Sequence, residues 1–295
     1  MTGSRGGGAG IDPGPAAPAL FTTDGPPATA EGRWHARVRP TDHARGPWDH
    51  ELLHGGPVCG LAAHAAERLA GPRLHCARLT VELLAGVPLE PLEVTATMAK
   101  PGRRTQLIDV TVVRAATGRV VARAFTQWAV PGAGDPPAGP VPARPPVTAT
   151  PWQEPHLDYP RPGFNCDAAE LRYTVGSNEQ PGPATIWVRL VSRLVDTAPL
   201  TALTQVATAA DLAAAAGWEP APDGSPGINP DLTLQLGRYP TGSWIGLAAL
   251  NRRWDGGVGF NDAVVYDDRS RLGTILQTLV TSPWALATAP DTPTG

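Results

Sequence analysis

Residues 55–69 read GGPVCGLAAHAAERL, an amphipathic stretch that predicts a helix stopped by Gly71. Four segments of alternating apolar and polar residues follow this helix, and proline and glycine separate them, as in an antiparallel meander. These segments are LHCARLTVELLAG, PLEVTATMAKPG, TQLIDVTVVRAATG and RVVARAFTQWAV. Two strand-like pieces, 19–23 and 34–39, precede the helix, so the first half predicts one helix against an antiparallel sheet.

The second half of the chain repeats this order of elements. Strand candidates at 170–175 and 185–191 precede an alanine-rich stretch, 200–216, which predicts a single helix, and four more strands follow. The repeat extends to individual residues, because Arg78-LTVEL resembles Asp231-LTLQL at a separation of 153 residues. The last strands of the two halves align at a separation of 152 residues. Such agreement indicates a duplicated structural unit.

A helix followed by a four-strand meander is the layout in which a curled sheet wraps a central helix, the hot-dog layout. We therefore predict an α+β protein, a tandem (double) hot-dog in which placing the units side by side joins two exposed sheet edges. The predicted parts are a disordered tail (1–17), an N-terminal hot-dog domain (18–130), a Pro/Ala-rich linker (131–162), a C-terminal hot-dog domain (163–282) and a second tail (283–295).

Composition excludes several classes of function. The 295 residues include 24 basic and 27 acidic side chains, so there is no basic field for nucleic acid. Cys59, Cys76 and Cys166 show no CxxC spacing, which argues against disulfides and structural zinc and favours a cytoplasmic protein. The sequence has no apolar run of membrane-spanning length and no histidine spacing typical of a metal site, so we expect neither a membrane span nor a metal.

The repeat reveals a chemical asymmetry between the halves. Asp231 stands where the first half has Arg78, and Gln277 stands where it has Phe125. Both polar residues lie among apolar strand neighbours, and burial would demand hydrogen-bond partners. The two side chains could partner each other through a water molecule, with the amide orienting the water and the carboxylate accepting its proton.

Simpler readings of these residues stay open. Asp231 follows Asn-Pro and could cap the start of a strand, while Gln277 could be a buried amide that satisfies a sheet edge. Asp211, within ATAADLAAAAG, is either an exposed helix residue or a supporting residue near the pocket.

With these features the chain resembles the type II acyl-CoA thioesterases, the double hot-dog hydrolases of medium-chain and long-chain acyl-CoA, over about residues 20–280. The matched motifs are a Gly-Gly pair opening the first helix (Gly55 and Gly56, after His54), an Asp followed by Arg, Pro and Trp (Asp231, Arg238, Pro240, Trp244), and a Gln on the last strand (Gln277). The family also carries a Thr on the strand after the Trp. This chain has Leu-Asn-Arg-Arg there, and Asn251 is the nearest substitute.

The resemblance implies hydrolysis of acyl-CoA thioesters by direct attack of water, without a metal or redox cofactor. Asp231 would be the general base or water orienter, Gln277 its partner and Asn251 the third polar group. A thioester carbonyl is already electrophilic, and the sequence has no GxSxG motif, so a serine nucleophile is neither required nor indicated.

The same resemblance implies the residues that bind substrate. The N–H groups of Gly55 and Gly56 would polarise the thioester carbonyl at the helix N-terminus, beside His54. Arg238 either meets the phosphates of coenzyme A or is an ordinary surface arginine.

Two other functions stay open at this point. A non-catalytic acyl-CoA or acyl-carrier binding protein would keep the fold and lose turnover. A hot-dog hydratase would need a histidine paired with a carboxylate, and the second half contains only His156. Acyl chain length, the acyl donor and assembly into a homo-oligomer are not determined by the sequence.

Overall fold

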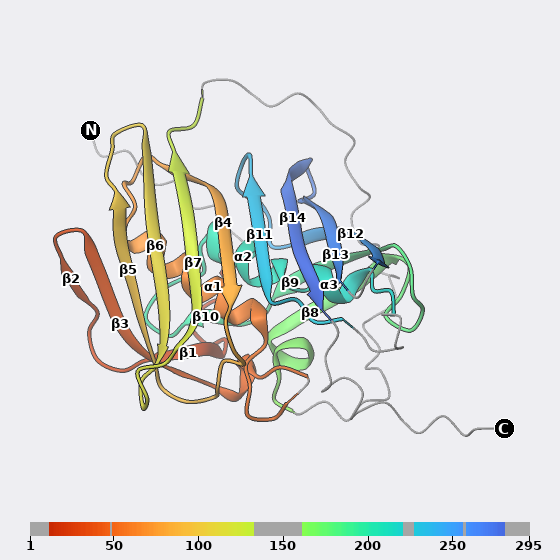
Figure 1. The fold of residues 1–295 in the computed structure, drawn as a ribbon, viewed down its shortest axis with the longest axis horizontal. Coiled ribbons are helices and arrows are strands. Elements are labelled where there is room, and N and C mark those ends of the chain that lie inside the picture. The colour runs from red at the N-terminus through yellow and green to blue at the C-terminus, as the bar shows by residue number, and fades with distance from the viewer. Residues whose placement is uncertain (1–11, 48, 133–160, 221–226, 256–257, 281–295) are drawn as a thin grey trace.

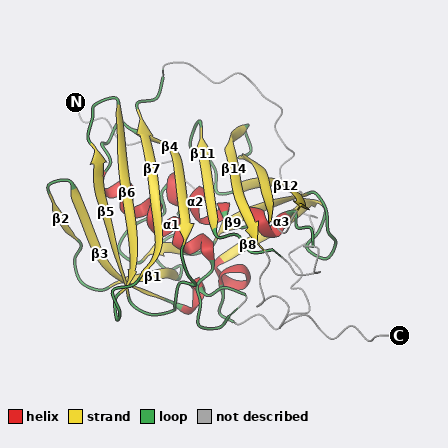
Figure 2. Ribbon diagram, in the orientation of Figure 1, coloured by secondary structure: helices red, strands yellow, loops and turns green. Residues whose placement is uncertain are grey.

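The computed structural model describes residues 12–47, 49–132, 161–220, 227–255 and 258–280, with the side chains of 250–255 excepted (Figure 1). One continuous sheet of 14 strands curls around the helices, which lie together on its concave side (Figure 2). The predicted tandem hot-dog is confirmed. The predicted linker falls mostly outside the described residues, so its boundaries stay a prediction.

The elements of the first unit follow the predicted order closely. They are β1 (Ala19–Thr23), β2 (Ala28–Ala30), β3 (Arg33–Pro40), the short 3-10 helix η1 (Asp42–Ala44), α1 (Gly55–Leu69), β4 (His75–Leu83), β5 (Leu92–Lys100), β6 (Thr105–Arg114) and β7 (Val120–Ala129).

Within the described residues, the second unit also has seven strands, but its third strand, β10, leaves the unit's own sheet and its helix is divided. Its elements are η2 (Phe164–Ala168), β8 (Ala169–Val175), β9 (Ala184–Leu190), β10 (Arg193–Val195), α2 (Ala202–Ala210), α3 (Ala213–Ala216), β11 (Asp231–Leu236), β12 (Ile245–Asp255), β13 (Val258–Tyr266) and β14 (Arg271–Val280).

The units join where β4 lies antiparallel to β11 in the middle of the sheet (Figure 1). Thr80 faces Thr233 across this joint, and their hydroxyl oxygens are 3.1 Å apart. These two residues are also 153 positions apart, the separation of the sequence repeat. A pseudo-two-fold axis therefore passes between them.

A second joint links the units at the other edge of the first one. The three-residue strand β10 pairs in parallel with β1, with Arg193 opposite Ala19. Because β10 follows β9 directly in the chain, the second unit supplies the edge strand of the first. This strand was not predicted, since three residues are too few to show a pattern.

Helices α1 and α2 pack against each other in opposite directions at the centre of the molecule. Gly55 lies at Asp211, whereas Glu67, near the other end of α1, accepts a 2.9 Å hydrogen bond from the Thr201 hydroxyl at the start of α2. The close approach depends on glycine, because a Cβ on Gly60 would lie 2.0 Å from the Thr208 hydroxyl oxygen.

Replacing Gly60 with alanine is therefore expected to push the two helices apart and lower the free energy of unfolding by about 1–3 kcal/mol, the usual cost of overpacking. Removing the clashing hydroxyl with Thr208→Ala should return part of this loss in the double variant, because the contact is shared by the two residues. Urea denaturation of the four proteins in this cycle measures the coupling, and strictly additive losses would contradict the shared contact.

Two sequence-based predictions about the second unit are wrong. The helix predicted over 200–216 is interrupted at Asp211 and Leu212, which separate α2 from α3. The last strands are also equivalent at a separation of 151 residues rather than 152, because Phe125 and Leu276 each pair with the residue on the pseudo-two-fold axis. Gln277 therefore corresponds to buried Thr126, and the shift by one residue exchanges the faces of the strand.

Candidate active site

A buried carboxylate lies where the two central helices meet. Asp211 follows the last residue of α2, and only 7% of its surface is exposed. Asn229, just before β11, donates a 2.7 Å hydrogen bond from Nδ2 to Oδ1 of this carboxylate. His54, which precedes α1 in the first unit, places Nδ1 3.1 Å from Oδ2. The carboxylate is thus held by residues from both units.

Nδ1 of His54 lies between the start of α1 and the carboxylate. It accepts a 3.0 Å hydrogen bond from the Gly56 amide and lies 3.1 Å from Oδ2 of Asp211. One ring nitrogen can either accept with its lone pair or donate a proton, so the contact with Gly56 and a hydrogen bond to Asp211 are alternatives. The Gly56 amide also serves the carboxylate as a donor. His54 therefore couples the N-terminus of α1 to Asp211.

These donors keep the buried carboxyl group ionised. Burial by itself would raise the pKa of Asp211, but hydrogen bonds from His54 and Asn229 and from the Gly56 amide bring its pKa below the ordinary value. Asp211 is therefore an anion at neutral pH, shielded from bulk water and able to accept a proton.

Gly55 leaves the space that this carboxylate occupies. A Cβ built on Gly55 would lie 2.6 Å from Oδ2 of Asp211, and one on Gly56 would lie 2.5 Å from the carbonyl oxygen of Thr208. Neither position can hold a side chain without movement of α1 or of the carboxylate. The glycines that were predicted to bind substrate therefore have a packing role as well, Gly55 against Asp211 and Gly56 against the backbone of α2.

Gln277, on β14, approaches the same place from the sheet. Its side chain is 1% exposed, and Nε2 lies 3.5 Å from the backbone carbonyl oxygen of Asp211. Its Oε1 accepts a 2.8 Å hydrogen bond from Nδ2 of Asn261 on β13. Within the described ranges, Oδ1 of buried Asn261 has no hydrogen-bond partner. Amides from two neighbouring strands therefore flank the end of α2.

The predicted pairing of Asp231 with Gln277 is wrong. Gln277 faces the helices with its buried neighbours on β14, whereas Asp231 lies on the other face of β11, because strand residues alternate between faces. Oδ1 of Asp231 accepts a 2.7 Å hydrogen bond from the backbone N–H of Thr278. Asp231 therefore ties the start of β11 to β14, and Asp211 takes the place near Gln277.

Arg238 does not extend toward a ligand as predicted. Its guanidinium donates two hydrogen bonds, of 2.7 and 2.5 Å, to the carboxylate of Asp267, whose side chain is fully buried. It also donates to the backbone and hydroxyl oxygens of Ser270. The arginine fastens β11 to the turn between β13 and β14. Asn251 lies in β12 opposite Asn261, and its side chain falls outside the described part of the chain.

The sequence-based reasoning assigned no role to Asn229 or Asn261 and left Asp211 undecided. One signal was available, since Asp211 is the sole charged residue between positions 200 and 217 in an alanine-rich helix. Such a helix has little polar surface to present to solvent, so its carboxylate must find partners inside the protein. No comparable pattern indicated the two asparagines, whose contacts depend on strand pairing.

Profiles of protein families match both halves of the chain. The acyl-CoA thioesterase N-terminal domain matches residues 44–128, and the acyl-CoA thioesterase C-terminal domain matches residues 135–281. The chain belongs to the acyl-CoA thioesterase family. As a thioesterase of this family it is a thioester hydrolase, and acyl-CoA is its general class of substrate.

Solved structures share the fold of this thioesterase over nearly their whole length. A protein of Novosphingobium aromaticivorans with a thioesterase assignment is 22% identical, with a TM-score of 0.68 over 86% of this chain and 97% of its own. Acyl-CoA thioesterase II of Mycobacterium marinum is 14% identical, with a TM-score of 0.59 over 87% and 94%. A hot-dog protein of Alicyclobacillus acidocaldarius is 15% identical, with a TM-score of 0.62 over 88% and 96%.

No protein of curated function matches the sequence of this thioesterase significantly. None of the helices in the described ranges has the length and hydropathy of a membrane span.

Proposed function

We propose that the thioesterase hydrolyses fatty-acyl or related acyl-CoA thioesters by direct attack of water, with Asp211 as the general base. The observation that carries this proposal is the buried, ionised carboxylate of Asp211, held by donors from both units. The role first predicted for Asp231 passes to Asp211, because Asp211 lies beside Gln277 and Asp231 does not.

The proposed reaction uses one water molecule and no other reagent. The water oxygen forms a bond to the thioester carbonyl carbon while Asp211 accepts a proton from the water. The tetrahedral intermediate then collapses, the C–S bond breaks, and the thiolate of coenzyme A takes the proton back from Asp211. A carboxylic acid and a free thiol leave the site, and Asp211 is again ionised.

The surrounding polar groups have separate positioning roles in this scheme. Asn229 and His54 fix the carboxylate, while Gln277 and Oδ1 of Asn261, which has no partner among the described residues, offer hydrogen bonds to a water molecule. The amide of Gly55 at the start of α1 would polarise the carbonyl as its oxygen becomes anionic. A cytoplasmic location stays a prediction; it fits the three free cysteines.

Replacing Asn229 with alanine tests this assignment through pH. The substitution removes a donor to the Asp211 carboxylate, so the pKa of Asp211 should rise toward the value that burial alone would give. The acidic limb of kcat/KM, which reports the base of the free enzyme, should then move to higher pH. Thiol release from a graded series of acyl-CoA esters gives the profile.

An unchanged acidic limb with lower activity would remove Asp211 from the role of base. Saturable binding of acyl-CoA without any turnover by the wild type would instead favour the alternative function, a non-catalytic acyl-CoA or acyl-carrier binding protein of the same fold. The two results are distinguishable, because binding is measured separately from thiol release.

A further inference from the structure

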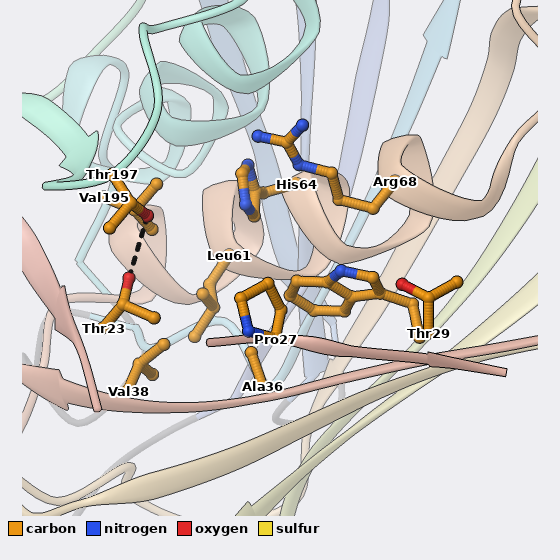
Figure 3. A pocket seen from close by; sticks show the side chains of 11 residues that line it. Thr23, Pro27, Thr29, Ala36, Val38, Leu61, His64, Arg68, Val195 and Thr197 are labelled. Atoms are coloured by element: carbon orange, nitrogen blue, oxygen red, sulfur yellow. Dashed lines mark hydrogen bonds between the residues drawn. The ribbon is translucent and has the colours of Figure 1, made fainter. Parts of the chain in front are cut away.

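A second cavity lies away from Asp211, toward the other end of α1. This pocket of about 390 Å³ lies between α1, strands β1 to β3 and the segment around the end of β10 (Figure 3). Its inner wall is buried and largely apolar, with Trp34, Val38, Leu61 and Val195 among its residues. No residue of the Asp211 site lines it.

The rim of the pocket is exposed and polar. Thr29, Arg68 and Thr197 lie there, and the Thr197 and Thr23 hydroxyl oxygens are 3.0 Å apart (Figure 3). Of the residues that the structure describes, no aspartate or glutamate lines the cavity. The nearby Asp196 does not line the cavity, and Oδ1 of its carboxylate accepts hydrogen bonds from the backbone N–H and the hydroxyl of Thr23. The pocket therefore combines an apolar interior with a cationic entrance.

The pseudo-two-fold axis relates the α1 wall of this pocket to the end of α2 that carries Asp211. The residues that cap α1 and α2, His54 and Thr201, are 147 positions apart. The same separation places His64 in α1 at the position that Asp211 has after α2. The first unit thus has a histidine where the second has its carboxylate, and the pocket opens beside that histidine.

His64 gives the pocket a neutral wall. The ring is 7% exposed and lies edge-on to Trp34, with ring centroids 5.9 Å apart. Burial, and secondarily the charge of Arg68, lower the pKa of His64 to about 4, so the ring is uncharged at neutral pH. A neutral ring packed among apolar side chains replaces the carboxylate. Among the described residues that line the pocket there is also no asparagine or glutamine, so the amides proposed to hold water beside Asp211 have no equivalent here.

Arg68 supplies the charge at the entrance. It lies one helical turn after His64, and Figure 3 shows its side chain extending along the pocket toward that ring. No ion pair or hydrogen bond engages Arg68 within the part of the chain that the structure describes. A guanidinium above an apolar cavity suits an anionic group attached to a hydrocarbon chain.

We propose that this pocket is a second, non-hydrolytic ligand site that binds an alkyl chain with an anionic head, the chain in the cavity and the head at Arg68. The inference goes beyond the proposed catalytic function and does not depend on it. A free fatty acid, which is the product of thioester hydrolysis, and a fatty acyl-CoA, through its phosphates, share this chemistry.

Calorimetric titration of octanoate into an Asp211→Asn variant tests the proposal without interference from turnover. Saturable binding of one octanoate per chain is expected. Arg68→Gln in the same background should weaken it about tenfold or more, because the charged hydrogen-bond donor is lost. Arg73→Gln, a matched change at an exposed arginine beyond the end of α1, should leave the affinity unchanged.

A second titration uses the non-hydrolysable thioether S-octyl-CoA in place of octanoate. Weaker binding of either ligand to the Arg68→Gln variant supports the proposal, and the ligand affected shows whether the pocket takes a free fatty acid or an acyl-CoA. A third titration uses Ala36→Leu, which narrows the cavity and should also weaken binding. The proposal is overturned if neither ligand saturates the protein, or if binding survives both Arg68→Gln and Ala36→Leu unchanged.

Discussion

Replacing Asp211 with asparagine is expected to lower thiol release from acyl-CoA by about 10²–10⁴-fold, the usual contribution of a general base. The substitution is nearly isosteric and keeps an oxygen acceptor for Asn229, so the packing of α1 against the end of α2 should persist. What it removes is the anion that accepts the proton of water. Steady-state assays at equal folded concentration, with circular dichroism to confirm folding, measure the effect on kcat.

The matched control for this experiment is Asp231→Asn. Asp231 lies on the outer face of β11 and bonds the Thr278 amide, a contact that an asparagine oxygen can also make. The thiol-release activity of the Asp231→Asn variant should stay within a few-fold of the wild type. If Asp231→Asn were inactive while Asp211→Asn kept its activity, the base would have to be placed on the outer face of the sheet.

Replacing Asp267 with alanine is expected to destabilise the second unit by about 3 kcal/mol, near the lower end of the range of roughly 3–5 kcal/mol for breaking a buried ion pair. The lower end applies because the side chain of Arg238 is 21% exposed and water can partly solvate the abandoned guanidinium. Asp267 also accepts hydrogen bonds from the backbone N–H groups of Arg269 and Ser270, which would lose their partner. The urea midpoint measures the loss.

Acid provides an independent test of the same ion pair. Although burial would raise the pKa of Asp267, the bonds from Arg238 and from backbone amides hold that pKa far below its ordinary value. Its contribution to stability is therefore fully present above the unfolded-state pKa, about 4, and is lost as the pH falls toward the folded-state pKa. The Asp267→Ala variant should lack this part of the acid dependence.

The exposed ion pair of Asp24 with Arg39 supplies the comparison. The side chains of Asp24 and Arg39 are 37% and 55% exposed, so Asp24→Ala should cost less than about 1 kcal/mol. Equal losses for the two aspartate variants would mean that the contacts of Asp267 do not stabilise the fold as its burial implies. An Arg238→Met variant that folded normally but bound acyl-CoA poorly would return Arg238 to the role of a ligand residue.

Local patterns predicted the fold because they are complete within short segments. The helix at 55–69 has its apolar face, its opening glycines and its stop within 17 residues, and it was predicted with its observed bounds. The strands that follow are long enough to alternate visibly. The divided helix around Asp211 had no such signal, because the residue that contacts Asp211 there, His54, lies 157 positions earlier in the chain.

The site was harder to predict for a related physical reason. Comparison of the two halves correctly drew attention to Gln277, yet an error of one residue in the alignment matched it with exposed Phe125 instead of buried Thr126. In a strand this error inverts the inside and outside faces. Asp231 was assigned to the interior for a separate reason, its apolar neighbours Leu232 and Leu234, which lie on the opposite face of β11. The face of the sheet that a side chain occupies follows from the pairing register, which depends on both strands and cannot be read from one segment of sequence.

The parallel pairing of β10 with β1 also bears on the order of events during biosynthesis. Domains generally fold as units, the N-terminal one first, as the chain leaves the ribosome. Here the strand that completes the edge at residues 19–23 is encoded at 193–195, so the first unit cannot acquire its final boundary until most of the second unit's leading segment has emerged. The N-terminal unit therefore leaves the ribosome with the edge of β1 unpaired. This edge is covered only when β10 of the second unit is available, so completion of the first unit depends on the second.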